Sequence, residues 1–583
     1  MRRLFLAYAV GLAPALLLAV AQPVWSRVDE AWHADVLAQY SHGVYPVLGV
    51  TGIQPEILRE MERTGVFRWD SFTSPPPDPA LTTFGPPPPD LTPYERGVWV
   101  RRHIWEYSYE ALQPPLYYLL ATPLWWAADA AGGTLAAIYA VRLLNAALVA
   151  LMAPLTFLLA RELFPGRTTL AVGAAALAAT VPGFVLNASQ VTNDAAAAVL
   201  GAVCLLLAAS GLRRGWSLPR AAWLGAAFGV ALLTKPTVIA LAPALAYAVL
   251  WPRATPGQRL ARALASAAAA AVVVAPWLLL NLAIYHSPTT GPAGQALNSA
   301  TVPWHLGPTF VVVNLLNLFI TFWSGDQLPY TARWAWPLAV LLVPLTALAG
   351  AGLFRLLRDR DGRRAALGLP VLAVLGAVTM SMVLPLASHN DFYSPGRYIY
   401  PELPAVAVLL SAGLLRELSG RLGQAAVASV AVGATFVILA YAVLGPAPKP
   451  GLPTHPPPAA ALRALSGQSS RAGLTVSVEE IRVSSGAVWV HVSAANSSSQ
   501  LIEWSPMPDV FVEGDPQPLA TGIYQLSDPF PEDLTPGQAV KGWIRMSGDR
   551  GRLASAGKLR FRFLQVAANG YHDVGDLFVT AAP

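Results

Sequence analysis

A series of long apolar runs with very few charges occupies most of this 583-residue sequence and limits what it can fold into. Runs of about 20 apolar residues match the thickness of the hydrocarbon core of a bilayer. Of the residues, 54% are hydrophobic and only 12% are charged, whereas a soluble domain carries about 25% charged residues. The sequence therefore predicts a polytopic α-helical membrane protein and excludes a cytosolic enzyme.

Eleven runs have the length and composition of membrane spans. They cover residues 4–24, 136–160, 168–187, 194–212, 219–234, 236–251, 262–284, 335–357, 365–387, 398–416 and 424–445. Two shorter runs rich in aromatic residues, 114–128 and 309–323, would raise the count to thirteen. Cytoplasmic loops collect Lys and Arg. With eleven spans, seventeen basic residues fall on the inner side, so the sequence favours eleven.

This topology places the N-terminus in the cytoplasm and the C-terminal region outside. The short runs 114–128 and 309–323 then become helices at the outer membrane surface, where aromatic residues are favoured. The large loop 25–113 lies on the same outer side as the C-terminal region. Residues 19–21 (Ala-Val-Ala) also resemble a signal-peptide cleavage site, and the orientation is the same in either case. We expect a multi-pass protein of a bacterial inner or plasma membrane.

An acidic motif follows the first run directly. Asp29 and Glu30 stand where a short helix would begin, and a helix N-terminus favours carboxylates. His33 lies one helical turn after Asp29, so the two side chains share a face. The motif predicts either an acid–base site or an ordinary helix cap with a solvated face.

A second acidic motif ends the outer loop. Residues 75–93 are proline-rich, which is typical of an extended connection. Beyond them, Glu110 stands just ahead of Gln113 and the Pro-Pro pair 114–115, a pattern that favours the start of a helix.

These motifs, in this order, resemble the GT-C glycosyltransferase superfamily, especially its bacterial protein mannosyltransferase and aminoarabinose transferase-like members. The resemblance covers about residues 1–445. It rests on Asp29-Glu30, Glu110 with Gln113-Pro-Pro-Leu-Tyr-Tyr118, Arg142-Leu-Leu-Asn145, Pro182, Val191-Thr-Asn-Asp194, Leu232-Leu-Thr-Lys-Pro-Thr237 and Gly396-Arg-Tyr-Ile-Tyr-Pro-Glu-Leu-Pro404. Many relatives carry His or Lys where this chain has Gln113, which puts a direct cationic contact to the donor phosphate at that position in doubt.

The resemblance implies a membrane glycosyltransferase that moves a sugar from a polyprenyl-phosphate donor to an acceptor at the outer face, with inversion. Such transfer needs a carboxylate base and groups that stabilise the leaving phosphate. Asp29 is the expected base, and Glu30 or Glu110 would position the acceptor or bind a metal. Some relatives use a divalent ion and others do not, so a metal ion stays open.

Few other polar residues lie at the same predicted membrane level. Lys235 and Arg397-Tyr398 are expected to contact the donor, although lysine and arginine at span ends also extend to lipid head groups. Further candidate substrate contacts are His33, Gln113, His389 and Asp391. His389 and Asp391 could also bind a metal ion as a pair. Arg142 and Arg333 are weaker candidates, and Asp194 is expected to cap a helix.

The C-terminal region changes character. Residues 446–470 begin with a proline-rich linker, and residues 471–583 alternate apolar and polar residues at the period of half-buried strands. The sequence predicts an extracytoplasmic, immunoglobulin-like β-sandwich that binds or covers the active face. The positive net charge reflects the membrane topology, so no nucleic-acid partner is expected. The expected partners are membrane lipids, a polyprenyl-phosphate-linked sugar and a glycan, lipid or protein acceptor.

Two alternatives remain open. A lipid or solute transporter or flippase would favour internal repeats and charge pairs within the membrane, and the sequence shows neither. A GT-C-like scaffold without catalysis would not need the Asp29-Glu30 pair.

Overall fold

The computed structural model divides into two compact units, which are described separately. One comprises Met1–Val66 and Pro77–Ala447, and the other comprises Phe67–Pro76 and Pro448–Pro583. The structure describes residues 2–25, 29–48, 50–64, 108–251, 254–289, 308–325, 328–358, 364–388, 394–418, 420–444, 456–458, 460–484, 488–512, 519–522, 530, 533–548, 553, 555–568 and 572–582.

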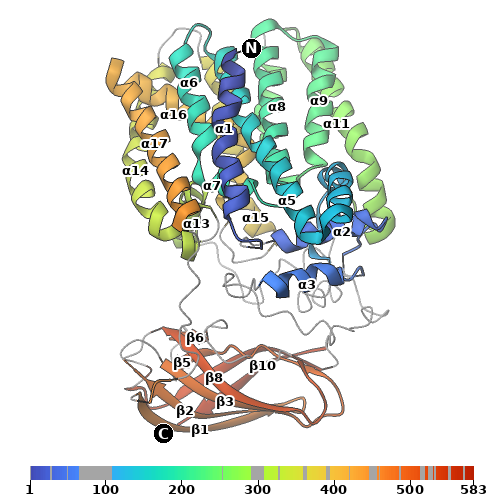
Figure 1. Cartoon of the computed structure of the whole chain (residues 1–583), viewed down its shortest axis with the longest axis vertical. Coiled ribbons are helices and arrows are strands. Elements are labelled where there is room, and N and C mark those ends of the chain that lie inside the picture. The colour runs from blue at the N-terminus through green and yellow to red at the C-terminus, as the bar shows by residue number, and fades with distance from the viewer. Residues whose placement is uncertain are drawn as a thin grey trace. The chain divides into compact units, whose positions relative to one another are not determined.

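The first unit is a bundle of helices (Figure 1). Its elements are α1 (Arg2–Ala21), α2 (Glu30–Ser41), α3 (Pro55–Thr64), η2 (Tyr109–Leu112), α5 (Leu116–Leu163), α6 (Thr168–Thr180), α7 (Pro182–Ala188), α8 (Asp194–Arg214), α9 (Leu218–Leu232), η3 (Pro236–Leu241), α10 (Ala242–Leu250), α11 (Pro256–Tyr285), α13 (Pro308–Ser324), α14 (Leu328–Arg358), α15 (Arg364–Ser388), η4 (Gly396–Glu402), α16 (Leu403–Glu417) and α17 (Gly420–Leu444).

Each of the eleven apolar runs predicted to span the membrane falls on helix in this unit, so the polytopic helical fold is confirmed. Among the described residues, seven helices are long and apolar enough to cross a bilayer, or eight if the bent pair α6 and α7 is one span. The count of eleven stays a prediction, because Leu218–Leu232 and Pro236–Leu250 form shorter apolar helices. The interfacial position of runs 114–128 and 309–323 also stays a prediction.

Glycine and proline account for the main breaks in these helices. Within α5, Gly133 has φ 78°, a left-handed conformation that glycine adopts without a steric penalty, and the helix is kinked there. The run 114–128 therefore forms the first part of α5, ahead of this break. Between α6 and α7 the axis turns by 51° at Val181, just before Pro182. Proline disfavours helical geometry in the preceding residue, so the chain bends there.

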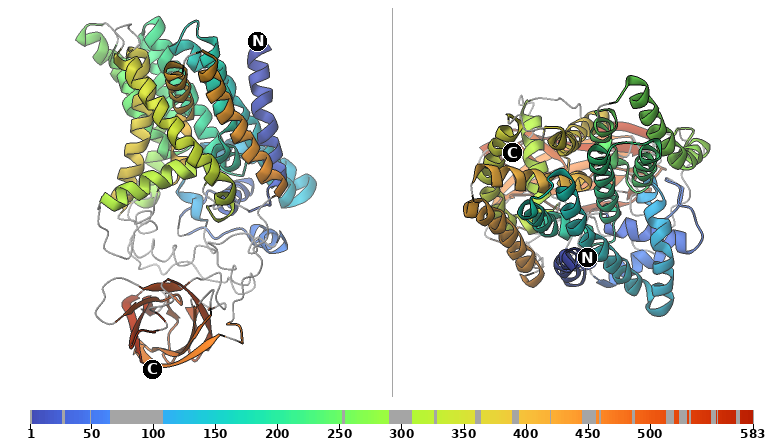
Figure 2. Two further views of the ribbon diagram at one scale, coloured as in Figure 1. Left: turned by 90° about the vertical axis from the view of Figure 1, so that its left-hand side faces the viewer. Right: turned by 90° about the horizontal axis from the view of Figure 1, so that it is seen from above.

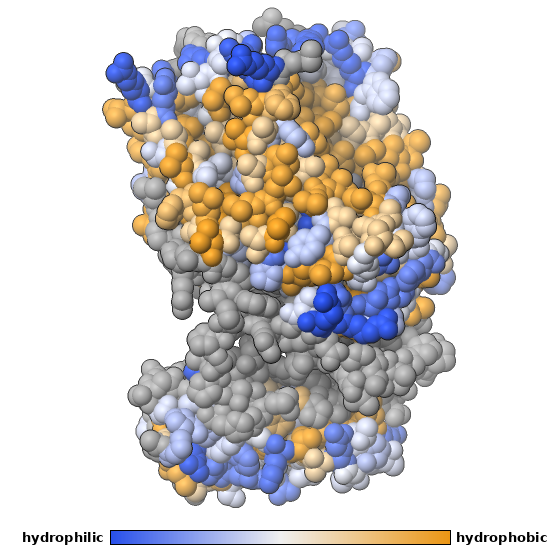
Figure 3. All heavy atoms as spheres, in the orientation of Figure 1, coloured by the Kyte–Doolittle hydropathy of each residue, from blue (hydrophilic) through white to orange (hydrophobic). Residues whose placement is uncertain are grey.

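The surface of the bundle carries a wide apolar zone with hydrophilic residues at both ends (Figure 3). Large apolar side chains of the bundle are exposed, including Phe5 (74%), Val272 (72%) and Val443 (80%). A soluble protein rarely exposes so continuous an apolar surface. Together with the apolar helices, this surface identifies a multi-pass membrane protein.

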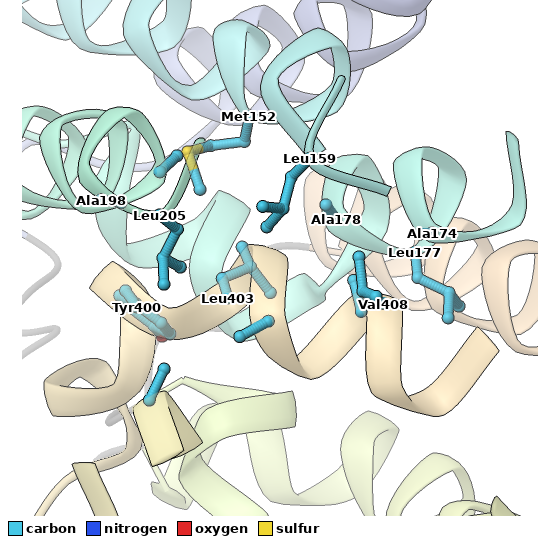
Figure 4. Packing of buried hydrophobic residues seen from close by; sticks show 14 of the residues in the cluster. Met152, Leu159, Ala174, Leu177, Ala178, Ala198, Leu205, Tyr400, Leu403 and Val408 are labelled. Atoms are coloured by element: carbon cyan, nitrogen blue, oxygen red, sulfur yellow. The ribbon is translucent and has the colours of Figure 1, made fainter. Parts of the chain in front are cut away.

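The interior is packed with small and branched side chains. Met152 and Leu159 from α5 meet Ala178 from α6, Leu205 from α8 and Leu403 from α16 in one cluster (Figure 4). Glycines allow helix backbones to approach closely, as at Gly352 and Gly413, where an added Cβ at either position would lie about 2 Å from a backbone oxygen of the facing helix. Such small-residue contacts are the usual way that helices associate in lipid.

The second unit is built from β-strands. They are β1 (Ala461–Arg471), β2 (Leu474–Val483), β3 (Val488–Asn496), β4 (Ile502–Glu503), β5 (Asp509–Val512), β6 (Ala520–Gly522), β7 (Asp533–Leu534), β8 (Ala539–Gly548), β9 (Leu559–Ala568) and β10 (His572–Ala581). Every pairing between these strands is antiparallel, and the order is β1-β2-β3-β8-β6-β5-β9-β4-β7, with β10 beside β9. The predicted antiparallel β-domain is thus confirmed.

The sheet curls so that its first and last strands meet. Ser466 in β1 forms an antiparallel bridge with Ala582, directly after β10, and the curled sheet is seen end-on in Figure 2. The predicted sandwich is therefore one continuous sheet around a core that includes Phe561 and Phe563. Strand β1 falls, except for Arg471, in the stretch 446–470 that was predicted to be a linker. The strand was not predicted because its sequence shows little alternation, and its pairing with β2 has a register shift between Ala464 and Gly467.

Candidate active site

The acidic motif after the first helix lies at the start of α2, as predicted. Asp29 precedes the helix with φ 73° and makes no side-chain cap. This left-handed conformation is unfavourable for most L-residues and is tolerated best by Asn and Asp. Arg397, the second residue of η4, donates a hydrogen bond from Nη2 to Asp29 Oδ2 at 2.8 Å. Asp29 therefore acts here as an ion-pair partner, and the helix-cap interpretation of its side chain is wrong.

Glu30 has a different environment from Asp29, although the two are adjacent. Arg142 donates from Nε to Glu30 Oε1 at 2.8 Å and from Nη2 to Oε2 at 2.7 Å, and both side chains are fully buried. The backbone N–H groups of Trp25 and Val191 donate to the same carboxylate at 2.9 and 3.0 Å. All four contacts fix the carboxylate, so Glu30 joins α2, α5 and the segment before α8.

Arg142 completes this arrangement from α5. Besides Glu30 it donates to the carbonyl oxygens of Ala19 (3.2 Å), Gln22 (2.8 Å) and Pro23 (2.9 Å) at the end of α1. A planar guanidinium with several fixed donors suits a buried site of this kind. Arg142 thus holds the end of α1 and the start of α2 together, a role that the sequence did not indicate.

His33 of α2 and Glu110 of η2 lie close to each other. His33 Nδ1 lies 2.7 Å from the hydroxyl oxygen of Tyr118, and Nε2 lies 4.0 Å from Glu110 Oε1. Burial lowers the pKa of His33 to about 3, so its ring is neutral at pH 7. Burial, and then the charge of Asp29, raise the pKa of Glu110 to about 8. A neutral carboxyl group at Glu110 can donate a hydrogen bond, and its Oε2 finds no hydrogen-bond partner in the described part of the chain.

Lys235 and Asp194 form a second buried ion pair at the same place. Lys235 Nζ contacts Asp194 Oδ1, and the two side chains are only 8% and 1% exposed. Lys235 directly precedes η3, and Asp194 is the first residue of α8. Asp194 was expected to act as a helix cap; instead its carboxylate binds Lys235, and α8 has no side-chain cap at Asn193. The charges of Lys235 and Arg397 both lower the pKa of Glu110 and so oppose the effect of burial.

Gln113 is linked to this second pair through Asn193. The Nδ2 atom of Asn193 donates to Gln113 Oε1 at 3.3 Å and to the carbonyl oxygen of Thr234 at 3.0 Å. The backbone N–H of Leu116 donates to the carbonyl oxygen of Leu233 at 3.1 Å. These contacts set the Gln113 segment beside Lys235, so a cation lies next to Gln113 even though the residue itself is neutral.

A buried carboxyl group connects α2 to the segment before α3. Asp35 Oδ1 accepts from the backbone N–H of Gln54 at 2.7 Å, and Gln54 donates to Gln39 Oε1 at 2.7 Å. Gln39 in turn donates to the carbonyl oxygen of Gly52 at 2.6 Å. Burial raises the pKa of Asp35 to about 7. This network orients α3 against the helix that carries His33.

The structure therefore brings together Asp29, Glu110, His33, Gln113, Lys235 and Arg397, with Glu30 beside them in a structural ion pair. Tyr398 follows Arg397 and is half-buried. The predicted pair His389 and Asp391 lies outside the described residues. The side chain of Arg333 also lies outside them. Among described residues, no group of three or more His, Cys, Asp or Glu could hold a metal ion, and metal dependence stays open.

Most of these residues were predicted from the sequence, but their partners were not. Arg142 was only a weak candidate, and Asn145, which donates to the carbonyl oxygens of Gln190 and Thr192, was noted only as part of a motif. Both lie on the buried face of α5, three residues apart. Their polarity within an apolar helix was the available signal.

Part of the helical bundle that carries this cluster of acids and cations is similar to a known protein family. Residues 132–279 match the family model described as dolichyl-phosphate-mannose-protein mannosyltransferase. This match covers part of the chain alone and agrees with the resemblance to the GT-C glycosyltransferase superfamily that the motifs predict. No curated protein sequence is significantly similar to the chain.

Several solved structures are similar to the chain at low identity. ArnT from Cupriavidus metallidurans bound to undecaprenyl phosphate is 19% identical, with a TM-score of 0.40 over 77% of this chain and 66% of that chain. The Archaeoglobus fulgidus oligosaccharyltransferase is 13% identical, with a TM-score of 0.38 over 75% and 56%. Arabinosyltransferase EmbB from Mycobacterium smegmatis is 14% identical, with a TM-score of 0.26 over 90% and 66%. The chain thus spans just under two thirds of the length of ArnT.

Proposed function

We propose that this protein is a membrane glycosyltransferase that transfers a sugar from a polyprenyl-phosphate donor to an acceptor at the outer face of a bacterial cell membrane. The observation that carries the proposal is the meeting of Asp29, Glu110, Arg397 and Lys235 at one end of an apolar bundle. Attack on an anomeric carbon requires a carboxylate base, and departure of a phosphate requires cations that stabilise its charge. The family match supports a phosphate-linked lipid donor.

Asp29 acts as the base in this proposal. Its carboxylate takes the proton from an acceptor hydroxyl, whose oxygen attacks the anomeric carbon from the side opposite the phosphate. The bond between that carbon and the phosphate oxygen breaks, and the polyprenyl phosphate leaves with both electrons, so the anomeric configuration inverts. Arg397 and Lys235 stabilise the charge that develops on the phosphate.

Arg397 links donor binding to the state of the base. It pairs with Asp29 at 2.8 Å, while a donor phosphate would compete for the same guanidinium. Glu110, which is neutral at pH 7, can donate a hydrogen bond to the donor or the acceptor. Gln113 adds an amide near Lys235, through the contact of Asn193 with its side-chain oxygen.

An apolar cavity close to Arg397 suits the lipid chain of the donor. It has a volume of about 260 Å³ and is lined by side chains from α13, α14, α15 and α16, among them Phe319, Val374 and Leu410. Ile399, two residues after Arg397, also lines it. A polyprenyl tail in this cavity would leave its phosphate near the guanidinium.

The test is transfer by the purified protein from a panel of polyprenyl-phosphate sugars to candidate glycan, lipid and protein acceptors. Wild type should form product, and Asp29→Asn should lose at least about 100-fold in rate, the contribution expected of a general base. Asp129→Asn is a matched control, because Asp129 lies on α5 and contacts Thr134 outside the site. Full activity of Asp29→Asn would exclude Asp29 as the base. Movement of lipid across vesicles without transfer would favour a flippase.

A further inference from the structure

A charged cavity lies at the end of the bundle that carries the N-terminus. It has a volume of about 590 Å³ and is formed by the start of α1, the end of α5 and the end of α8. Its polar lining consists of Arg2, Arg3, Arg161, Arg213 and Glu162. The N-terminus and the α2–α3 segment lie at opposite ends of the bundle (Figure 1), so this cavity is separate from the candidate active site.

The charges in this cavity are unbalanced. Glu162 is its single acid, and Arg213 donates to Glu162 Oε2 at 3.0 Å. Arg214 donates to the other oxygen of the same carboxylate. Both oxygens of Glu162 are therefore engaged by α8, and the charges of Arg2, Arg3 and Arg161 have no acid in the cavity lining to balance them. Arginines that outnumber the carboxylates of a cavity favour a phosphate ligand.

The walls of the cavity are apolar on the side of the bundle interior. Phe157 and Leu158, one turn before Arg161 on α5, line it together with Leu4 of α1. Next to Leu4, Phe5 is 74% exposed and Leu6 is 63% exposed. A charged cavity therefore lies at the end of a helix, α1, that exposes large apolar side chains, which suits a molecule with an anionic head and an apolar tail.

A neighbouring cavity extends the basic surface. Its volume is about 450 Å³, and it is lined by Arg167, Arg416 and the first residues of α6. The two cavities share Gly166, in the turn between α5 and α6. Backbone N–H groups at a helix start add donors for an anion.

We infer that the cavity around Arg2, Arg3, Arg161 and Arg213 binds the head group of an anionic phospholipid, with the acyl chains lying along Phe5 and Leu6. Basic pockets between membrane helices are suited to such head groups. This site is independent of the proposed transfer reaction, because none of its residues belongs to the candidate active site.

The test uses the full chain, purified in detergent and depleted of lipid. Phosphatidylglycerol, phosphatidylcholine and inorganic phosphate are added separately, thermal unfolding is recorded, and native mass spectrometry counts bound lipids. We expect phosphatidylglycerol alone to raise the melting temperature and to remain bound. Arg161→Gln and the double variant Arg2→Gln/Arg3→Gln should lose at least half of that rise. Arg2 and Arg3 are exposed, so the double variant tests the site even if Arg161→Gln does not fold.

The matched control is Arg259→Gln/Arg262→Gln, which removes two arginines near the start of α11, outside the cavity lining. This control should keep the full effect of phosphatidylglycerol. An equal loss in the control would show that general surface charge is responsible and would overturn the site. An equal effect of inorganic phosphate, or no effect of phosphatidylglycerol on the wild type, would also overturn the lipid assignment.

Discussion

Replacing Glu30 by Gln should destabilise the bundle, whereas replacing its neighbour Asp29 should mainly stop transfer. Glu30 accepts four hydrogen bonds, two from Arg142 and one each from the N–H groups of Trp25 and Val191. An amide offers one oxygen in place of two. In either orientation its NH2 group would face one N–H of Arg142 and one backbone N–H.

The cost follows from the burial of Arg142. Its side chain is fully buried, so Glu30→Gln leaves an uncompensated charge in the interior. Breaking one partner of a buried ion pair costs about 3–5 kcal/mol. For a bundle of this size we expect the melting temperature to fall by about 3–5 °C. Asp29 is 13% exposed and retains solvent contact, so Asp29→Asn should cost about 1 kcal/mol or less.

The protein supplies its own probe for this measurement. Cys204 on α8 is the sole cysteine of the sequence and is fully buried. A thiol-reactive fluorophore therefore labels the protein only when the bundle opens. Melting curves recorded at one fixed heating rate allow the wild type, Glu30→Gln and Asp29→Asn to be compared even if unfolding is irreversible.

Two results would refute this reasoning. If Glu30→Gln melted within 1 °C of wild type, the ion pair with Arg142 would not be a structural contact. If Glu30→Gln kept its stability but lost transfer, Glu30 would act on the substrate, as the motif alone had suggested. Loss of stability in Asp29→Asn equal to that in Glu30→Gln would remove the distinction between the two acids.

Three further predictions concern the same site. Lys235→Met should lower the free energy of unfolding by about 3–5 kcal/mol, because Asp194 would remain buried and charged. The double variant with Asp194→Asn should recover most of the lost stability in the thiol assay. The pKa of Glu110 is raised from 4.5 to about 8, so the folded state binds the extra proton and the stability of the wild type should fall as pH rises across that range; Glu110→Gln should flatten this slope. Gly396→Ala would place a Cβ 2.0 Å from the backbone nitrogen of Phe322, so it should cost about 2 kcal/mol and weaken donor binding.

Each of these predictions has a contrary result. Additive losses in the double variant would show that Lys235 and Asp194 do not interact. An unchanged pH slope in Glu110→Gln would mean that Glu110 is ionised in the fold, and Asp35, with a pKa raised to about 7, would then account for the slope. Wild-type stability of Gly396→Ala would show that α13 can move away from η4.

The fold could largely be predicted from the sequence because apolar run length is a local property. Runs such as 194–212 and 262–284 correspond to α8 and α11, and the alternating strands β2, β3, β8 and β9 were also indicated. Strand β1 could not be predicted in the same way. Its pairing with β2 depends on contacts across the sheet, which compensate for a weak pattern in its own residues.

The site residues could be predicted, but their partners could not. Position in a motif selected Asp29, Glu30, Lys235 and Arg397. The pairing of Glu30 with Arg142 spans 112 residues of sequence, and no local pattern determines which helices pack together. The different environments of Asp29 and Glu30 therefore emerged only from the assembled bundle.

The ion pair between Arg397 and Asp29 also has a consequence for biosynthesis. The two residues are separated by 368 positions in the chain. At a translation rate of about 5–20 residues per second, Asp29 waits roughly 20–70 s for its partner to be made. A nascent chain that ends before Arg397 carries Asp29 without its cation. The proposed active site can therefore form only after η4 has been synthesised and inserted.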